Sequence, residues 1–320
     1  MKAAWLVTGI CALGCAALVG RAFQGQPPQG QTAPTQAESA KDVNRIVLDV
    51  TRVNMLFTVT DKKGRFITNL TQNDFEVIES KQKQVIQQFT AESNLPLRLA
   101  ILVDTSSSIR ERFRFEQEAA ASFINGVVRR AVDKAMIVSF DTNAELVTDL
   151  TDEVTQLDKG IMGLRPGGGT ALYDAIFFAC RDKLQKDQPR DKFRRALIIV
   201  TDGEDNQSHV TRDQALEMAQ KADTVIYAIS TNITHIETDG DKLLKYLTAE
   251  TGGQAFFPFK VEDLEQSFEN IANELRHQYN IFYRPVPLWT DGMYHAVQLR
   301  VKDRKDYQVR ARKGYYAPKL

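Results

Sequence analysis

Apolar runs and amphipathic segments alternate along the chain between residues 97 and 279. The short apolar runs are typical of buried strands, and apolar positions every three to four residues are typical of helices. We expect strands at Leu97–Val103, Lys134–Phe140, Glu145–Asp149, Ala196–Thr201, Thr224–Ile229 and Gln254–Phe257. We expect helices at Arg112–Arg130, Asp152–Met162, Ala171–Gln185, Arg212–Lys221, Asp241–Glu250 and Val261–Tyr279. This alternation predicts an α/β fold, with a doubly wound, mostly parallel sheet covered by helices on both faces.

The segments on either side of this α/β domain have strand periodicity. Residues 44–94 contain three or four short alternating runs, and residues 280–320 return to the same pattern. Each segment alone is too short to bury a core of its own. We therefore expect the two segments to form one smaller all-β sandwich, with the α/β domain, residues 95–279, inserted between them.

The first 43 residues have a different composition. Residues 3–20 are uncharged, with Lys2 before them and Arg21 after them, which is typical of an export signal or an N-terminal membrane anchor over residues 1–22. Residues 23–43 are rich in Gln, Pro and Thr and predict a flexible linker. We expect an exported protein, periplasmic, cell-surface or secreted. A cleaved signal is favoured over a retained membrane tether, and a lipoprotein ranks third.

The charge and cysteine content of the chain bear on its partners and on disulfide bonding. Lys and Arg number 41, and Asp and Glu also number 41, so no net charge favours nucleic acid as a partner. Cys11 and Cys15 lie in the targeting segment, which leaves Cys180 as the one cysteine of the remaining sequence. No internal disulfide is therefore expected.

Three polar stretches fall at the predicted edge of the sheet. The sequence "DTSSS" follows the first strand of the α/β domain, "GGGT" precedes a helix, and "TDGED" follows the fourth strand. Ligands bind beyond the carboxyl ends of the strands in such sheets. Side chains with oxygen donors suit hard cations, so we expect Mg²⁺, with Mn²⁺ and Ca²⁺ as alternatives. The candidate metal ligands are Asp104, Ser106, Ser108, Thr170 and Asp202.

These stretches resemble the metal-ion-dependent adhesion site (MIDAS) of von Willebrand factor type A domains, over roughly residues 97–279. The matching parts are D-x-S-x-S, the threonine of "GGTALYDA" and the aspartate of "TDGED". The resemblance implies a Rossmann-like domain that is not an enzyme. In that family the serines bind the ion directly, the threonine binds it directly or through water, and the aspartates often act through water. A protein partner's Asp or Glu completes the coordination. The flanking segments resemble those of secreted bacterial relatives common in acidobacteria.

Other side chains are expected near the rim of this site. They are Glu204, Asp205, His209, Asn232, His235 and Glu237. One alternative function is a metal-dependent hydrolase, for which Glu204 and Asp205 are the only candidate general bases. Another is a scaffold whose metal only stabilises the fold. The "DTSSS" stretch also has a plainer interpretation, as a loop in which a serine caps a helix.

Two further patterns bear on function. The stretch "GLRPGGGT" nearly has the spacing of a phosphate-binding loop, but Gly169 stands where that loop needs lysine. The last predicted helix has an apolar stripe formed by Leu264, Phe268, Ile271 and Leu275, which predicts a core-facing surface. Because this helix leads into the second β segment, we hypothesise that it couples the state of the metal to the sandwich.

Overall fold

The computed structural model describes residues 52–91, 95–110, 113–189, 192–232, 234 and 236–319. The predicted targeting segment, the linker and the start of the first β segment lie outside these residues, as does His235. In the described part of the chain, no helix combines the length and apolar character that a membrane span requires.

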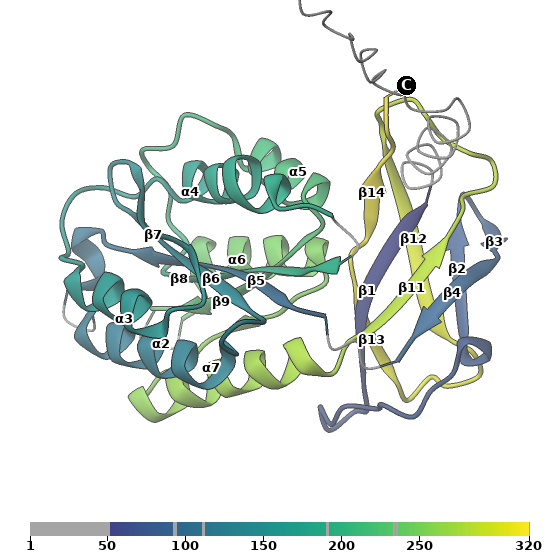
Figure 1. The fold of residues 1–320 in the computed structure, drawn as a ribbon, viewed down its shortest axis with the longest axis horizontal. Coiled ribbons are helices and arrows are strands. Elements are labelled where there is room, and N and C mark those ends of the chain that lie inside the picture. The colour runs from purple at the N-terminus through teal and green to yellow at the C-terminus, as the bar shows by residue number, and fades with distance from the viewer. Residues whose placement is uncertain are drawn as a thin grey trace, which may run out of the picture. The chain divides into compact units, whose positions relative to one another are not determined.

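A six-stranded sheet forms the centre of the α/β domain (Figure 1). The strand order is β10-β9-β8-β5-β6-β7, and β7 alone pairs antiparallel to its neighbour. The strands are β5 (Leu97–Asp104), β6 (Lys134–Phe140), β7 (Ala144–Thr151), β8 (Arg194–Thr201), β9 (Thr224–Ser230) and β10 (Ala255–Phe256). Every residue of β5, β8 and β9 is buried, as expected for strands covered on both faces. The predicted doubly wound, mostly parallel sheet is confirmed.

Helices cover both faces of this sheet, and alternate residues of β5 point to opposite layers. On one side, Leu99 and Ile101 pack in a core with α2 (Phe113–Val127), α3 (Val154–Gly163) and α7 (Val261–Arg276). On the other side, Ala100 and Leu102 pack in a core with α4 (Leu172–Phe178), α5 (Arg212–Lys221) and α6 (Asp239–Thr251). The apolar stripe predicted on the last helix faces the first of these cores.

The C-terminal parts of two predicted helices adopt another regular structure. The helix expected at Ala171–Gln185 is α-helical only over α4, and continues as a π-helix, η3 (Ala179–Lys183), and a 3₁₀ turn, η4 (Leu184–Lys186). The helix expected to reach Tyr279 ends at Arg276, and Tyr279 begins strand β11. The Tyr279 ring stacks on Phe57 with centroids 5.4 Å apart, and its hydroxyl donates to Ile67 O at 2.8 Å. Burial of this aromatic side chain in the sandwich stabilises the strand over another helical turn.

The flanking segments form two four-stranded sheets in which all pairings are antiparallel. One has the order β13-β1-β11-β4 and the other β14-β12-β2-β3. The first contains β1 (Val53–Thr60), β4 (Ile86–Thr90), β11 (Tyr279–Tyr283) and β13 (Gln308–Ala311). The second contains β2 (Phe75–Glu79), which follows a 3₁₀ turn η1 (Gln72–Asp74), with β3 (Gln82–Gln84), β12 (Tyr294–Val301) and β14 (Gly314–Tyr316). Each sheet draws strands from both ends of the chain, and one apolar core lies between them.

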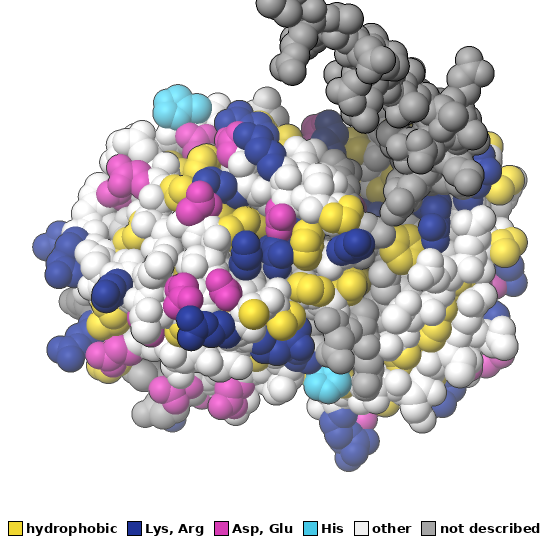
Figure 2. Space-filling model, in the orientation of Figure 1, with side chains coloured by type: hydrophobic (Ala, Val, Ile, Leu, Met, Phe, Trp, Pro, Cys, Tyr) yellow, Lys and Arg dark blue, Asp and Glu magenta, His cyan; other side chains and the backbone are white. Residues whose placement is uncertain are grey.

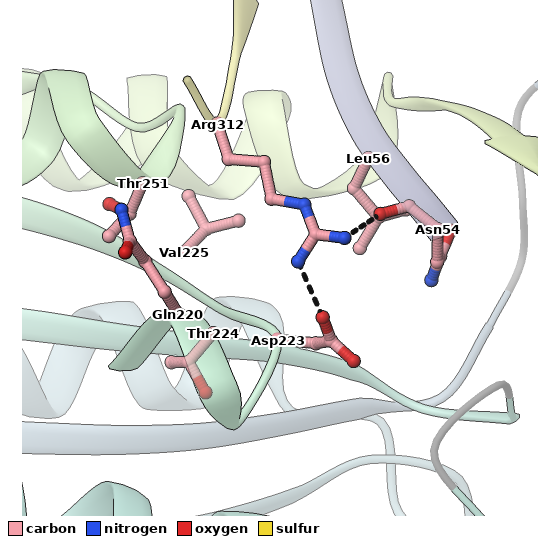
Figure 3. A pocket seen from close by; sticks show the side chains of 8 residues that line it. All are labelled: Asn54, Leu56, Gln220, Asp223, Thr224, Val225, Thr251 and Arg312. Atoms are coloured by element: carbon pink, nitrogen blue, oxygen red, sulfur yellow. Dashed lines mark hydrogen bonds and ion pairs between the residues drawn. The ribbon is translucent and has the colours of Figure 1, made fainter. Parts of the chain in front are cut away.

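Arg312 joins this sandwich to the α/β domain (Figure 3). Its Nη1 donates to Asp223 Oδ1 at 2.6 Å, just before β9, and its Nη2 donates to the carbonyl of Asn54 on β1. The backbone of Gly252, at the end of α6, packs against the same place, since an added Cβ would lie 2.6 Å from Arg312 N. A cavity of about 20 Å³ remains beside Arg312, which is room for about one water molecule.

Candidate metal centre

Asp104 ends strand β5, and its carboxylate is fully buried. Its Oδ2 accepts from Thr201 Oγ1 at 2.6 Å, and its Oδ1 accepts from the backbone N–H of Ser106 at 2.8 Å. Burial raises the pKa of Asp104 to about 6, although the hydrogen bonds from Thr201 and Ser106 act in the opposite direction. Both carboxylate oxygens are therefore fixed, and they hold the "DTSSS" loop against the end of β8.

Three side-chain oxygens meet in front of Asp104. The Oγ atoms of Ser106 and Ser108 are 2.9 Å apart, and Ser108 Oγ donates to Asp202 Oδ2 at 2.9 Å. Neighbouring ligands of an octahedral ion with ~2.1 Å bonds lie about 3 Å apart, so these spacings fit the coordination shell of a small divalent cation. The structure therefore brings together Ser106, Ser108 and Asp202 from the ends of two strands.

Backbone hydrogen bonds join the "GGGT" stretch to the loops of the other two polar stretches. Gly167 N donates to Thr105 O at 2.6 Å, and Asn206 N donates to Thr170 O at 2.9 Å. In return, Thr170 N donates to Asn206 Oδ1 at 3.0 Å. Thr170, which is 3% exposed, is thus held between the loops that follow β5 and β8.

The alternate residues of "DTSSS" have a different role. Thr105 is buried and its N–H donates to Phe140 O at 2.9 Å, while Ser107 Oγ donates to Gly168 O at 3.3 Å. Ser106 precedes a short 3₁₀ turn, η2 (Ser107–Ile109), and within the described residues its side chain makes no capping hydrogen bond. The Ser106 hydroxyl therefore does not cap this turn, and its contact is with the Ser108 hydroxyl.

The donor set is unusual in its composition. Among the described residues, no three His, Cys, Asp or Glu side chains gather as a metal site. The centre combines hydroxyls with the carboxylates of Asp104 and Asp202, and these two charges balance one divalent ion. Oxygen donors of this kind fit Mg²⁺ or Mn²⁺. Because two carboxylates leave no excess negative charge around a divalent ion, the ion can still attract an external carboxylate.

The two candidate general bases are placed differently from each other. Asp205 Oδ2 accepts from Tyr173 N at 3.0 Å and from Ser208 Oγ at 2.6 Å, so it holds the start of α4. Glu204 is exposed, and its N–H donates to Asp202 Oδ1 at 3.1 Å. Asp205 is therefore a structural residue of the loop, and Glu204 is an exposed neighbour of Asp202.

The other predicted rim residues in the described part of the chain have partners on the helices α4 and α6. His209 is exposed and lies 2.8 Å from Asp174 through its Nδ1. Asn232 Nδ2 donates to Asp241 Oδ2 at 2.7 Å, and Glu237 pairs with Lys245 at 2.5 Å. The prediction for His235 falls outside the described residues.

Two residues of the site were missed by the sequence analysis. Thr201 orients Asp104, and the side chain of Asn206 orients Thr170. A threonine at the end of an otherwise apolar strand was the available signal for Thr201, because a buried hydroxyl requires a partner. No comparable signal marks Asn206, whose role depends on a loop 36 residues away in sequence.

Two curated proteins are similar to parts of this chain. An uncharacterized protein of Borreliella burgdorferi is 26% identical over 145 residues, which is 41% of this chain and 39% of that protein. Calcium-activated chloride channel regulator 1 of Bos taurus is 25% identical over 211 residues, which is 63% of this chain and 20% of that protein. The chain thus spans less than half the length of either relative.

The α/β domain is similar to a solved structure and to a family model. A solved structure, von Willebrand factor type A from Catenulispora acidiphila, shares the fold at a TM-score of 0.50 and 14% identity, over 78% of this chain and 76% of that one. Residues 99–204 match the family model of the von Willebrand factor type A domain, which confirms the resemblance of the three polar stretches. The α/β domain of this chain is therefore similar to von Willebrand factor type A domains, by sequence over residues 99–204 and by fold.

Proposed function

We propose that this chain is an exported, divalent-metal-dependent protein-binding module of the adhesion type. The observation that carries the proposal is the cluster of Ser106, Ser108 and Asp202 oxygens, spaced 2.9 Å apart at the edge of the sheet where ligands bind. Ser108 is exposed and Asp202 is half-buried, so an ion at this cluster is accessible to a partner.

Each residue of the centre has a distinct task in this proposal. Ser106, Ser108 and Asp202 face the ion, and Thr170 completes the set from the neighbouring loop. Asp104 lies behind them, where its charge stabilises the ion and its hydrogen bond positions Ser106. The metal, Mg²⁺ first and Mn²⁺ or Ca²⁺ otherwise, supplies a positive charge for a partner's Asp or Glu.

Binding is favoured over catalysis. Residues 99–204 match the von Willebrand factor type A domain, whose resemblance implies a binding module, and of the two candidate general bases, Asp205 is already engaged at the start of α4. Charges of both signs are interspersed on the face that Figure 2 shows, which supports a protein partner rather than a nucleic acid. Export, with or without a membrane tether, rests on the sequence of residues 1–22.

The test uses a matched pair of serines in one loop. The wild-type full chain and the variants Ser108→Ala and Ser107→Ala are each used to capture partners from a native extract. Each capture is done in Mg²⁺ and in EDTA. We expect EDTA and Ser108→Ala to abolish capture. Ser107→Ala should keep it, because the Ser107 hydroxyl contacts Gly168 O rather than the oxygen cluster.

Other results identify the alternatives. A scaffold whose metal only stabilises the fold predicts a lower melting temperature in EDTA, with capture unchanged. A hydrolase predicts metal-dependent turnover of generic esters or phosphates that is lost in Ser108→Ala. Either result contradicts the proposed function.

A further inference from the structure

A pocket of about 230 Å³ lies at the same edge of the sheet as the metal centre. Its walls come from the loop after β9, from α6, and from the residues after β10. The lining residues that matter here are Ile236, Glu237, Asp241, Lys245, Phe257 and Phe259. The volume is far above the roughly 15 Å³ that a single water molecule requires, so the pocket has room for a side chain.

The pocket adjoins the metal centre through Gly240. This residue, in the first turn of α6, packs directly on the backbone that carries Asp202. A Cβ added to Gly240 would lie 2.2 Å from Asp202 O, and one added to Gly203 would lie 2.5 Å from Gly240 O. Asp241, the next residue, lines the pocket. A peptide segment bound at the ion therefore has neighbouring side chains within reach of this pocket, since each extended residue spans about 3.3 Å.

The charges in the pocket are already balanced. Lys245 Nζ pairs with Glu237 at 2.5 Å and lies 4.8 Å from the centre of the Phe257 ring. The Asp241 carboxylate accepts from Ser230 Oγ at 2.7 Å, from Asn232 Nδ2 at 2.7 Å and from Thr238 N at 3.0 Å. A basic side chain would have to displace one of these partners.

The surface that remains for a guest is apolar. Ile236 is 76% exposed at the pocket, and Phe257 and Phe259 form further parts of its wall. Large exposed apolar side chains around a hollow are typical of interaction sites. Covering Ile236 and the phenylalanine rings with an apolar group removes apolar area from water on both sides.

We propose that this pocket binds a large apolar side chain of the same partner segment whose Asp or Glu coordinates the metal. The inference rests on the proposed function and specifies its ligand, an extended acidic segment with a Phe- or Leu-like residue beside the acid. Metal coordination orients the segment, and the pocket selects the neighbouring side chain.

The test uses short synthetic peptides on an array. Each has one central Asp, with Phe, Leu, Lys or Ser placed at successive positions on either side and a Gly/Ser background. The full chain is applied in Mg²⁺ and in EDTA, as wild type, Ile236→Asp and Val85→Asp. Val85→Asp is the matched control, because Val85 is 78% exposed and lies between β3 and β4 of the sandwich.

We expect metal-dependent capture that is about tenfold tighter for Phe or Leu peptides than for the Ser peptide. Ile236→Asp should remove this preference while keeping capture of the Asp peptides, and Val85→Asp should change neither. Metal-dependent capture with no preference for Phe or Leu, or with a preference for Lys, overturns the inference and leaves the proposed function intact. Capture that is absent, or the same in EDTA, overturns the proposed function as well.

Discussion

The partly exposed Arg310 and the buried Glu274 form an ion pair between strand β13 of the sandwich and the last turn of α7. Arg310 Nη2 lies 2.8 Å from Glu274 Oε2, and Glu274 Oε1 also accepts from Thr58 Oγ1 on β1 at 3.1 Å. Glu274 is 1% exposed, and burial raises its pKa above the usual range, with Arg310 opposing that effect. The end of α7 is therefore fastened to two strands of the sandwich by charged and polar contacts.

Removing one partner of this pair should destabilise the protein strongly. Arg310→Ala leaves a buried carboxylate without its cation, so we expect the free energy of unfolding to fall by about 3 kcal/mol, measured by urea unfolding. The matched control is Arg304→Ala. Its pair with Asp306 is roughly half exposed, and its loss should cost less than about 1 kcal/mol. Equal losses in the two variants would contradict the role assigned to Arg310.

The hypothesis that α7 couples the metal to the sandwich stays a prediction, and the Arg310–Glu274 pair gives it a route. If it is correct, Mg²⁺ should change hydrogen exchange in both α7 and β13 relative to EDTA. In Arg310→Ala the change should remain in α7 and disappear from β13. The coupling would be refuted if hydrogen exchange in α7 were the same with and without metal, both in the presence and in the absence of a captured partner.

Thr201 should control metal affinity although it is placed behind the ligands. Thr201→Val keeps the side-chain shape but removes the donor to Asp104 Oδ2. Loss of such a supporting hydrogen bond typically weakens metal binding 10- to 100-fold, and we expect about tenfold for Mn²⁺ by titration calorimetry. Thr224→Val is the control, because this buried threonine donates to Ala222 O at the opposite end of the sheet. Unchanged Mn²⁺ affinity in Thr201→Val would show that Asp104 needs no support from this hydroxyl.

Gly240 should be intolerant of a side chain for a purely steric reason. Its added Cβ would lie 2.2 Å from Asp202 O, so Gly240→Ala must displace the backbone of a proposed metal ligand. We expect a lower melting temperature and weaker Mn²⁺ binding. Gly126→Ala in α2 has open space around the new Cβ, and should leave metal binding unchanged while raising stability by up to about 1 kcal/mol. A Gly240→Ala protein with wild-type stability and affinity would show that the close approach is not required.

Asp133 should make the fold sensitive to acid. Burial alone would raise its pKa, but hydrogen bonds from Arg129, from Leu97 N and from Arg276 lower the pKa to about 2. The unfolded value is about 3.9. Because the folded pKa is the lower one, the stabilisation is complete above about pH 4 and is lost as the pH falls towards 2.

The full effect is about 3 kcal/mol, of which about two thirds is lost between pH 5 and pH 2.5. This loss can be measured as the difference in unfolding free energy between pH 5 and pH 2.5, compared with Asp133→Asn. The variant lacks the titrating group and should show a smaller decrease. The same decrease in both proteins would mean that other carboxylates account for the acid sensitivity.

Local patterns in the sequence determined the class of fold and indicated the candidate site. The spacing of apolar residues reflects the geometry of each strand and helix, which is why β6 and α5 have the predicted bounds. The same reasoning placed Asp104, Ser106, Ser108, Thr170 and Asp202 at strand and helix ends, since parallel strands present their carboxyl ends at one edge.

Only the tertiary structure decided which side chains meet. Thr201 donates to Asp104 across 97 residues of sequence, and Arg310 reaches Glu274 across 36. The sequence indicated Asp205 only as a rim residue, and the structure adds that its carboxylate holds the start of α4. Periodicity describes the direction of a side chain from its own element, whereas a hydrogen bond or ion pair depends on the distance between two elements. That distance is set by packing of the whole core, so these contacts have no local signature in the sequence.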